Sequence, residues 1–221
     1  MIDFDILCKR ILQERAFEKC NGTVEFSENN MFLTMTLPKE SWCVKKLDGK
    51  FQTLKKALRT PKCSDAVVWM QTDSGQWNLH IFELKETVTK FGKSSGWDHI
   101  KCQFVRAYRL CKMIAAALDI EFEQVVFYTV FTNDDDISSV FATDVSETDD
   151  TEDPSILLPD RDMPDDMPSP RIEWASEKCR FDDNGWSDNY TTKEHPHKRI
   201  LLTESINETY VATGSLVLTG K

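Results

Sequence analysis

Two carboxylates and one amine occur at spacings that suit the hydrolysis of a phosphodiester. Asp65 begins an apolar run over residues 65–70, and Glu83 and Lys85 end a second run over residues 77–85. Hydrolysis requires charge stabilisation at the phosphate and a nucleophilic water, and a divalent cation between two carboxylates supplies both. Mg²⁺ suits such a site because it accepts few carboxylates and keeps several waters. A nearby ammonium group orients the attacking water or offsets developing charge.

A β-hairpin is the element that must bring these groups together. Residues 73–75, Asp-Ser-Gly, are typical of the turn between two strands. Side chains alternate along a strand, so Glu83 and Lys85 project from the same face, about 6.6 Å apart along the strand. In an antiparallel hairpin the start of one strand adjoins the end of the other. The sequence therefore predicts that Asp65 lies beside Glu83.

A long helix and a further strand follow the hairpin. Residues 95–98, Ser-Gly-Trp-Asp, resemble a capping box, and the apolar positions from Trp97 to Leu118 recur with the strongest helical period in the chain. Residues 125–131 form an apolar, β-branched run that predicts a buried strand. Strand, helix and strand in this order predict a parallel crossover.

The remaining segments predict one helix and further strands. Residues 1–20 have apolar side chains at helical spacing, which predicts an amphipathic helix. Residues 23–26 and 31–37 alternate and predict a hairpin. Residues 199–203 and 210–218 predict two more strands, which either form a β-hairpin that joins the core or make a small separate unit.

This order of elements resembles the PD-(D/E)xK nuclease superfamily. The matching residues are Pro61, four positions before Asp65, and the triplet Glu83-Leu84-Lys85, and the resemblance spans roughly residues 1–132. It implies an α/β fold with a restriction-endonuclease-like αβββαβ core, in which helices flank a mixed central sheet. An acidic C-terminal extension follows this core.

The resemblance also implies an activity and roles for particular residues. The protein would be a nuclease that uses Mg²⁺ or Mn²⁺ and acts on DNA. Asp65 and Glu83 would bind the metal, and Lys85 would assist the attacking water. The first helix often lends another acid, for which we select Glu14 as a metal ligand. Some relatives place a glutamine and a tyrosine on the helix after the Glu-x-Lys strand, and these would be Gln103 and Tyr108, which are five residues apart rather than four.

A basic segment before Asp65 is the predicted nucleic-acid contact. A nuclease needs cationic groups near its site because the phosphate backbone supplies most of the binding free energy. Residues 45–62 contain a single acid, Asp48, and seven basic residues: Lys45, Lys46, Lys50, Lys55, Lys56, Arg59 and Lys62. A solvated helix face is the plainer interpretation of the same residues.

The net charge of −10 is concentrated in one part of the chain. Residues 1–140 hold 19 Lys and Arg against 19 Asp and Glu, whereas residues 141–221 hold 8 against 18. The distribution predicts a nuclease-like core over residues 1–140, an acidic linker or loop over residues 141–170, and a C-terminal extension over residues 171–221. The extension is a candidate surface for a protein partner or for self-association.

Cysteine usage and hydropathy bear on the compartment. The seven cysteines are widely spaced and form no CxxC pair, which favours free thiols in a reducing compartment. The first twenty residues are too charged for a secretory signal, and no apolar run approaches the ~20 residues of a membrane span. We expect a cytoplasmic protein with no membrane contact, or a nuclear one if the cell is eukaryotic.

Other interpretations remain open on the sequence alone. The same fold occurs in catalytically inactive, nuclease-like subunits that bind protein or nucleic acid. An unrelated α/β interaction protein would make the Glu-x-Lys triplet accidental. In that case Asp65 would cap a turn, and Glu83 with Lys85 would be a solvent-facing ion pair. His195 and His197 are expected in an exposed polar loop.

Overall fold

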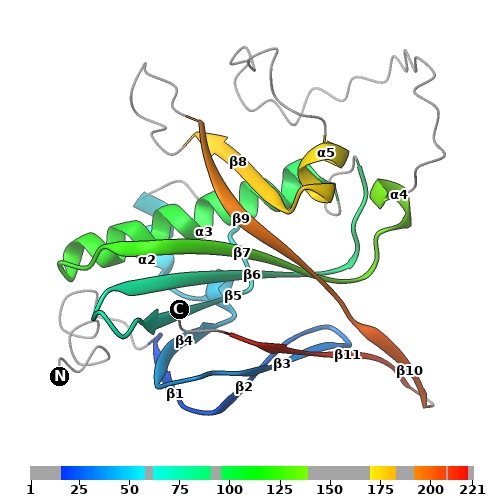
Figure 1. Cartoon of the computed structure of the whole chain (residues 1–221), viewed down its shortest axis with the longest axis horizontal. Helices are drawn as coiled ribbons and strands as arrows, with labels where there is room; N and C mark the ends of the chain where they lie inside the picture. The colour runs from blue at the N-terminus through cyan, green and yellow to red at the C-terminus, as the bar shows by residue number, and fades with distance from the viewer. Residues whose placement is uncertain are drawn as a thin grey trace.

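The computed structural model describes residues 16–57, 62–90, 96–138, 170–182, 192–207 and 209–218. These residues form a mixed α/β fold with more strand than helix, arranged in three layers (Figure 1). A helical layer dominated by α3 (Trp97–Ala117) covers one face of a larger mixed sheet, and a smaller mixed sheet covers the other face.

The larger sheet has seven strands in the described residues. In spatial order they are β1 (Glu18–Cys20), β4 (Ser41–Lys45), β5 (Ala66–Gln71), β6 (Trp77–Thr87), β7 (Phe122–Asn133), β9 (Thr192–Leu201) and β8 (Lys178–Asp182). Strands β4, β5 and β6 pair antiparallel, and β7 pairs parallel to β6 and to β9. The parallel pairing of β6 and β7 across α3 confirms the predicted crossover.

The smaller sheet contains the predicted hairpin near the start of the chain. Its order is β10 (Thr203–Asn207), β11 (Thr209–Val217), β3 (Met31–Thr36) and β2 (Thr23–Glu28), with β11 parallel to β3. The chain passes from the larger sheet to the smaller one at Leu202, whose amide donates to the Phe131 carbonyl (2.7 Å). Strand β9 therefore continues into β10 and ties the two sheets together (Figure 1).

Alternating side chains divide the core into two parts. On one face of the larger sheet, residues such as Trp69, Ile81 and Phe127 pack against α3. On the other face, residues such as Phe82 and Val68 pack against the smaller sheet. Short elements complete the described fold: a 3₁₀ turn (Leu47–Gly49), α2 (Gln52–Ala57), α4 (Asp135–Ser138) and α5 (Pro170–Ala175).

A buried ion pair fastens α5 to α3. Glu173 Oε2 accepts hydrogen bonds from Lys101 Nζ (2.6 Å) and Trp97 Nε1 (3.0 Å), and Glu173 Oε1 accepts one from the Arg180 amide (3.0 Å). The side chains of Lys101 and Glu173 are only 11% and 2% exposed. Every acceptor atom of this carboxylate therefore has a donor, as burial of a charge requires.

Two predictions about helices need correction. Residues 18–20, expected at the end of a helix, form β1 and pair antiparallel with β4, because the backbone hydrogen bonds of that edge outweigh local periodicity. The N-cap of α3 is Gly96, which has no side chain to cap with, so the predicted capping box is not formed. Residues 1–15 and all but one of residues 141–170 lie outside the described residues.

Two predictions about the C-terminal segment also need correction. His195 and His197 lie in β9 rather than in an exposed loop, and His197 is 1% exposed, with Nε2 2.9 Å from Thr129 Oγ1. Residues 204–207, expected between the strands over residues 199–203 and 210–218, belong to β10, so the hairpin is β10–β11 and β9 belongs to the larger sheet.

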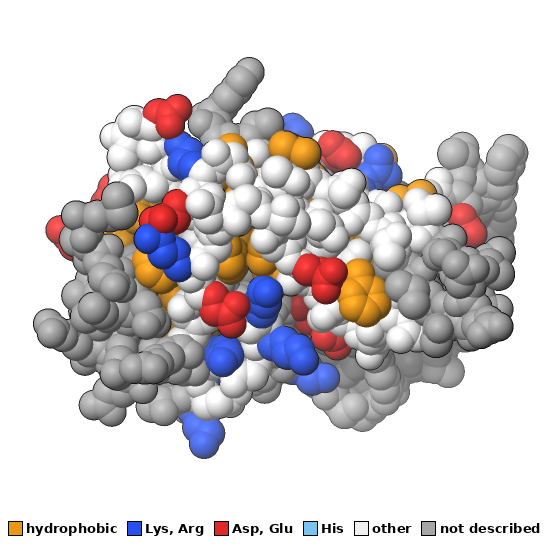
Figure 2. Space-filling model, turned by 90° about the horizontal axis from the view of Figure 1, so that it is seen from below, with side chains coloured by type: hydrophobic (Ala, Val, Ile, Leu, Met, Phe, Trp, Pro, Cys, Tyr) orange, Lys and Arg blue, Asp and Glu red, His pale blue; other side chains and the backbone are white. Residues whose placement is uncertain are grey.

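The outer face of the smaller sheet is polar. Figure 2 shows it covered by uncoloured polar and backbone atoms with acidic and basic side chains intermixed, and with few hydrophobic side chains in view. Thr23, Glu25 and Ser27 point outward from β2, while Val24 and Phe26 are buried. Among the described residues, no helix is long and apolar enough to cross a membrane.

Removal of one partner from the buried ion pair should destabilise the fold. We expect Lys101→Met to lower the free energy of unfolding by about 3 kcal/mol, because it leaves the Glu173 charge buried without its ammonium. The double variant Lys101→Met/Glu173→Gln should recover part of this loss, since an amide carries no charge to neutralise. Urea unfolding measures the free energy of unfolding of both variants. A double variant no more stable than Lys101→Met would contradict a buried ion pair between Lys101 and Glu173.

Candidate active site

The β5–β6 hairpin brings the predicted carboxylates into register. Ala66 pairs with Phe82, so one more step along the ladder places Asp65 opposite Glu83. The Asp65 amide donates to the Phe82 carbonyl (3.0 Å), and Asp65 Oδ2 accepts a hydrogen bond from the Leu84 amide (2.7 Å). Asp65 thus holds the neighbouring strand with its own side chain.

Glu83 is a charged side chain in the interior. It alternates with Leu79 and Ile81 on the face of β6 that packs against α3, and its exposure is 0%. Lys85 Nζ lies 2.6 Å from Glu83 Oε1, and the Lys85 side chain is 22% exposed. Within the described residues, Glu83 Oε2 has no hydrogen-bond partner. The pair is therefore a buried carboxylate covered by a half-buried amine, not the solvent-facing ion pair of the alternative interpretation.

Electrostatics favour a proton or a cation at this carboxylate. Burial raises the pKa of Glu83 to about 8, and repulsion from Asp65 adds to the shift, while Lys85 opposes it. Burial alone would lower the pKa of Lys85, but Glu83, Asp65 and Glu28 together hold it above its ordinary value. The negative charge of Asp65 therefore favours a proton or a cation at Glu83.

Several cationic groups lie near His99, and Lys85 is one of them. The pKa of His99, in the first turn of α3, is lowered first by burial and then by the positive charges of Lys85, Arg106 and Lys62. These side chains therefore lie near one another, around the end of β6. Sequence reasoning missed His99 and Arg106, although both stand on the helix face that also carries Gln103, at spacings of four and three residues.

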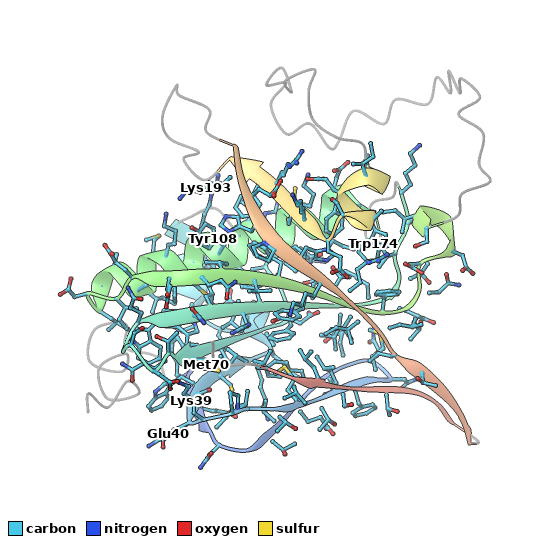
Figure 3. The ribbon with its side chains drawn as sticks, viewed as in Figure 1. Lys39, Glu40, Met70, Tyr108, Trp174 and Lys193 are labelled. Atoms are coloured by element: carbon cyan, nitrogen blue, oxygen red, sulfur yellow. The ribbon has the colours of Figure 1, made fainter. Side chains whose placement is uncertain are left out.

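The helix places Gln103 and Tyr108 differently. Gln103 is 5% exposed, one turn after His99, and its Oε1 has no hydrogen-bond partner in the described part of the chain. Tyr108 lies on another side of α3, beside β9 (Figure 3), and its ring packs against Phe181 and His195. The two side chains therefore do not act together, and Glu14 lies outside the described residues.

The predicted basic segment is dispersed. Lys55 is buried (3% exposed), so it offers no surface charge, and Lys45 lies 4.0 Å from Glu18 Oε2. Lys46, Lys50, Lys56 and Lys62 are at least partly exposed, and Arg59 is outside the described residues. The Leu47 amide donates to the Asp65 carbonyl (2.7 Å), so the start of this segment does lie against the site.

The metal-binding capacity of the site rests on two carboxylates. Across the described ranges, no group of three or more His, Cys, Asp or Glu side chains could hold a metal ion. Asp65 and Glu83 form a two-carboxylate arrangement, which is the number that Mg²⁺ commonly accepts from a protein.

The chain matches no protein-family model, no curated protein and no solved structure.

The elevated pKa of Glu83 predicts a distinct dependence of stability on pH. Between its ordinary value of 4.5 and about 8, the folded protein holds a proton that the unfolded chain releases, so stability falls as pH rises through that window. Glu83→Gln cannot ionise, and its stability relative to the native protein should grow by a few kcal/mol, as an order of magnitude, from pH 5 to pH 9.

Urea unfolding in EDTA at both pH values measures this effect. Glu86→Gln provides the matched control, because Glu86 is an exposed glutamate on the same strand. Parallel pH profiles for the native protein and Glu83→Gln would refute the assignment of a buried, proton-binding carboxylate.

Proposed function

We propose that this protein is a metal-dependent nuclease with a restriction-endonuclease-like core, and that it hydrolyses phosphodiester bonds in DNA. The observation that carries the proposal is the meeting of Asp65, Glu83 and Lys85 at the end of one hairpin, with Glu83 fully buried. Burial of a carboxylate lowers the stability of the fold. Acids with strongly shifted pKa values cluster at functional sites.

The order of the strands supports the same proposal. Strands β4, β5 and β6 run antiparallel, and α3 then leads to β7, parallel to β6. This is the strand arrangement that the resemblance implies around its Asp and Glu-x-Lys motifs. Asp65 immediately precedes β5, and Glu83 lies in the second half of β6, where the pairing with β5 ends.

The residues of the site fit a divalent cation. Glu83 Oε2 is buried and has no partner among the described residues, and the pair of carboxylates favours positive charge. Asp65 and Glu83 would hold Mg²⁺ or Mn²⁺, which would supply charge stabilisation at the phosphate and a more acidic water. The protein side chains provide the remaining chemistry.

Each side chain has a definite task in this proposal. Asp65 fixes the register of the hairpin through the Leu84 amide, so it orients Glu83 as well as offering a ligand. Lys85 keeps its proton because three acids surround it, and it can donate a hydrogen bond to the attacking water or to a phosphate oxygen. Leu79 and Ile81 share the α3-facing side of β6 with Glu83 and make its surroundings apolar.

Cleavage assays with substituted proteins test the activity. Purified protein should cut linear or circular DNA in Mg²⁺ or Mn²⁺ and not in EDTA, with single-stranded DNA and RNA as further substrates. Glu83→Ala and Lys85→Ala should each reduce cleavage by at least about 100-fold, the cost of losing one preorganised electrostatic group. Glu86→Gln should cleave as the native protein does. Cleavage that survives in Glu83→Ala would refute the proposed site.

A catalytically inactive, nuclease-like binding subunit is the second candidate. The close Lys85–Glu83 ion pair favours it, because the ammonium already neutralises the carboxylate that a metal would need.

Calorimetry with Mn²⁺ separates the two candidates. For the nuclease, we expect binding that tightens as the pH rises toward about 8, since the metal must displace the proton of Glu83. Glu83→Gln should abolish this binding. If the native protein binds no Mn²⁺ at pH 8 or 9, the inactive subunit becomes the better description.

A further inference from the structure

The outward side of α3 is strongly basic. The helix contains one acid, Asp98, and four basic residues. Lys101 is occupied inside the molecule by Glu173. The other three basic residues of the helix are partly or fully exposed, and they are Arg106, Arg109 and Lys112.

Two of these side chains carry charge that the described protein does not neutralise. Arg106 and Arg109 are partly exposed, and neither forms an ion pair with an acid in the described part of the chain. They are three residues apart, about 4.5 Å along the helix axis and on neighbouring sides of it. Both charges reach Cys102, where they oppose the increase in its pKa that burial causes. The guanidinium groups therefore lie over one strip of the helix.

This strip continues toward the candidate active site. His99 lies on the same side of α3 as Arg106, and the charges of Lys85 and Lys62 reach it. From His99 to Arg109 the helix advances about 15 Å. A nucleic-acid strand presents a phosphate every ~3.4 Å of its axis, so this length faces about four phosphates.

We propose that the α3 strip, formed by His99, Arg106 and Arg109, binds the phosphodiester backbone of nucleic acid and leads it to the site at Asp65 and Glu83. The inference rests on the proposed function for the reaction at that site. It goes beyond that function by assigning the backbone contacts to α3 rather than to the segment of residues 45–62.

Charge and shape identify the ligand. Guanidinium groups match phosphate oxygens in a two-point geometry that ammonium groups lack, and Arg106 and Arg109 have no competing carboxylate among the described residues. The alternative segment is less suited, since Lys55 is buried and Lys45 already faces Glu18. A rigid helix also presents its charges at fixed spacing, which lowers the entropic cost of binding a regular backbone.

Salt-dependent binding tests the proposal without requiring cleavage. The Glu83→Gln protein, in EDTA, is titrated into a fluorescent DNA duplex of about 20 base pairs at salt concentrations from about 50 to 200 mM. Single-stranded DNA and RNA of equal length distinguish the form of nucleic acid that is preferred. Arg106→Gln and Arg109→Gln should each flatten the slope of log Kobs against log salt by about 0.9 on duplex DNA, and the double variant by about twice that.

Lys198→Gln is the matched control. Lys198 is exposed and pairs in register with Tyr128, on the face of the larger sheet opposite α3. Its removal changes the net charge by the same amount and should leave the slope unchanged. Unchanged urea midpoints for all variants would show that folding is intact.

Three outcomes would overturn the proposal. They are an unchanged slope in both arginine variants, an equal loss in Lys198→Gln, and no binding of any probe at the lowest salt. Failure of the proposed nuclease is a separate result. If the native protein cleaves DNA with metal but the arginine variants keep the native salt slope, only the proposed role of the α3 strip is refuted. If binding depends on the α3 arginines but no cleavage occurs, only the proposed nuclease activity is refuted.

Discussion

The pairing of β6 between β5 and β7, with both of its faces covered, is the constraint on which the other features depend. Strand β6 is buried by α3 on one side and by the smaller sheet on the other. A strand in that position is ordinarily apolar along its length. Glu83 breaks the pattern at a point where water is excluded, so its charge must be met by a proton, an ammonium group or a metal. The same pairing places Asp65 and Lys85. The β5–β6 register sets Asp65 opposite Glu83, and side-chain alternation along β6 puts Lys85 on the same face as Glu83.

Among the described residues, two carboxylates are buried, and their surroundings differ. Glu173 receives three hydrogen bonds, one of them from the Lys101 ammonium group, so its lone pairs are largely satisfied and it holds α5 against α3. Glu83 has one close cationic neighbour and an oxygen without a described partner. A group that is buried but incompletely satisfied costs stability. This difference is what separates a candidate site from a structural ion pair, although both combine lysine and glutamate.

Local periodicity accounts for the parts of the fold that the sequence predicted. The hairpin, α3 and β7 carry long, regular apolar patterns, and the adjacency of Asp65 and Glu83 follows from hairpin register. The parts that the sequence did not reveal depend on distant partners. Residues 192–201 are polar and contain Pro196, yet they form β9 because β8 and β7 supply hydrogen bonds on either side. Apolar residues at helical spacing identify the buried face of α3 but carry no information about the charges on its outward face. The α3 strip was therefore not predicted.

The parallel pairing of β3 with β11 has a consequence for how the chain acquires its structure. Met31 is aligned with Ala212, so the two halves of this sheet are separated by roughly 180 residues of chain. A ribosome must therefore release almost all of these residues before the early hairpin gains its second neighbour. Until then, one edge of β3 and the apolar inner face of the hairpin remain available to other chains. Contacts between such distant segments also slow folding, so the newly made protein has a long interval in which a chaperone could protect it.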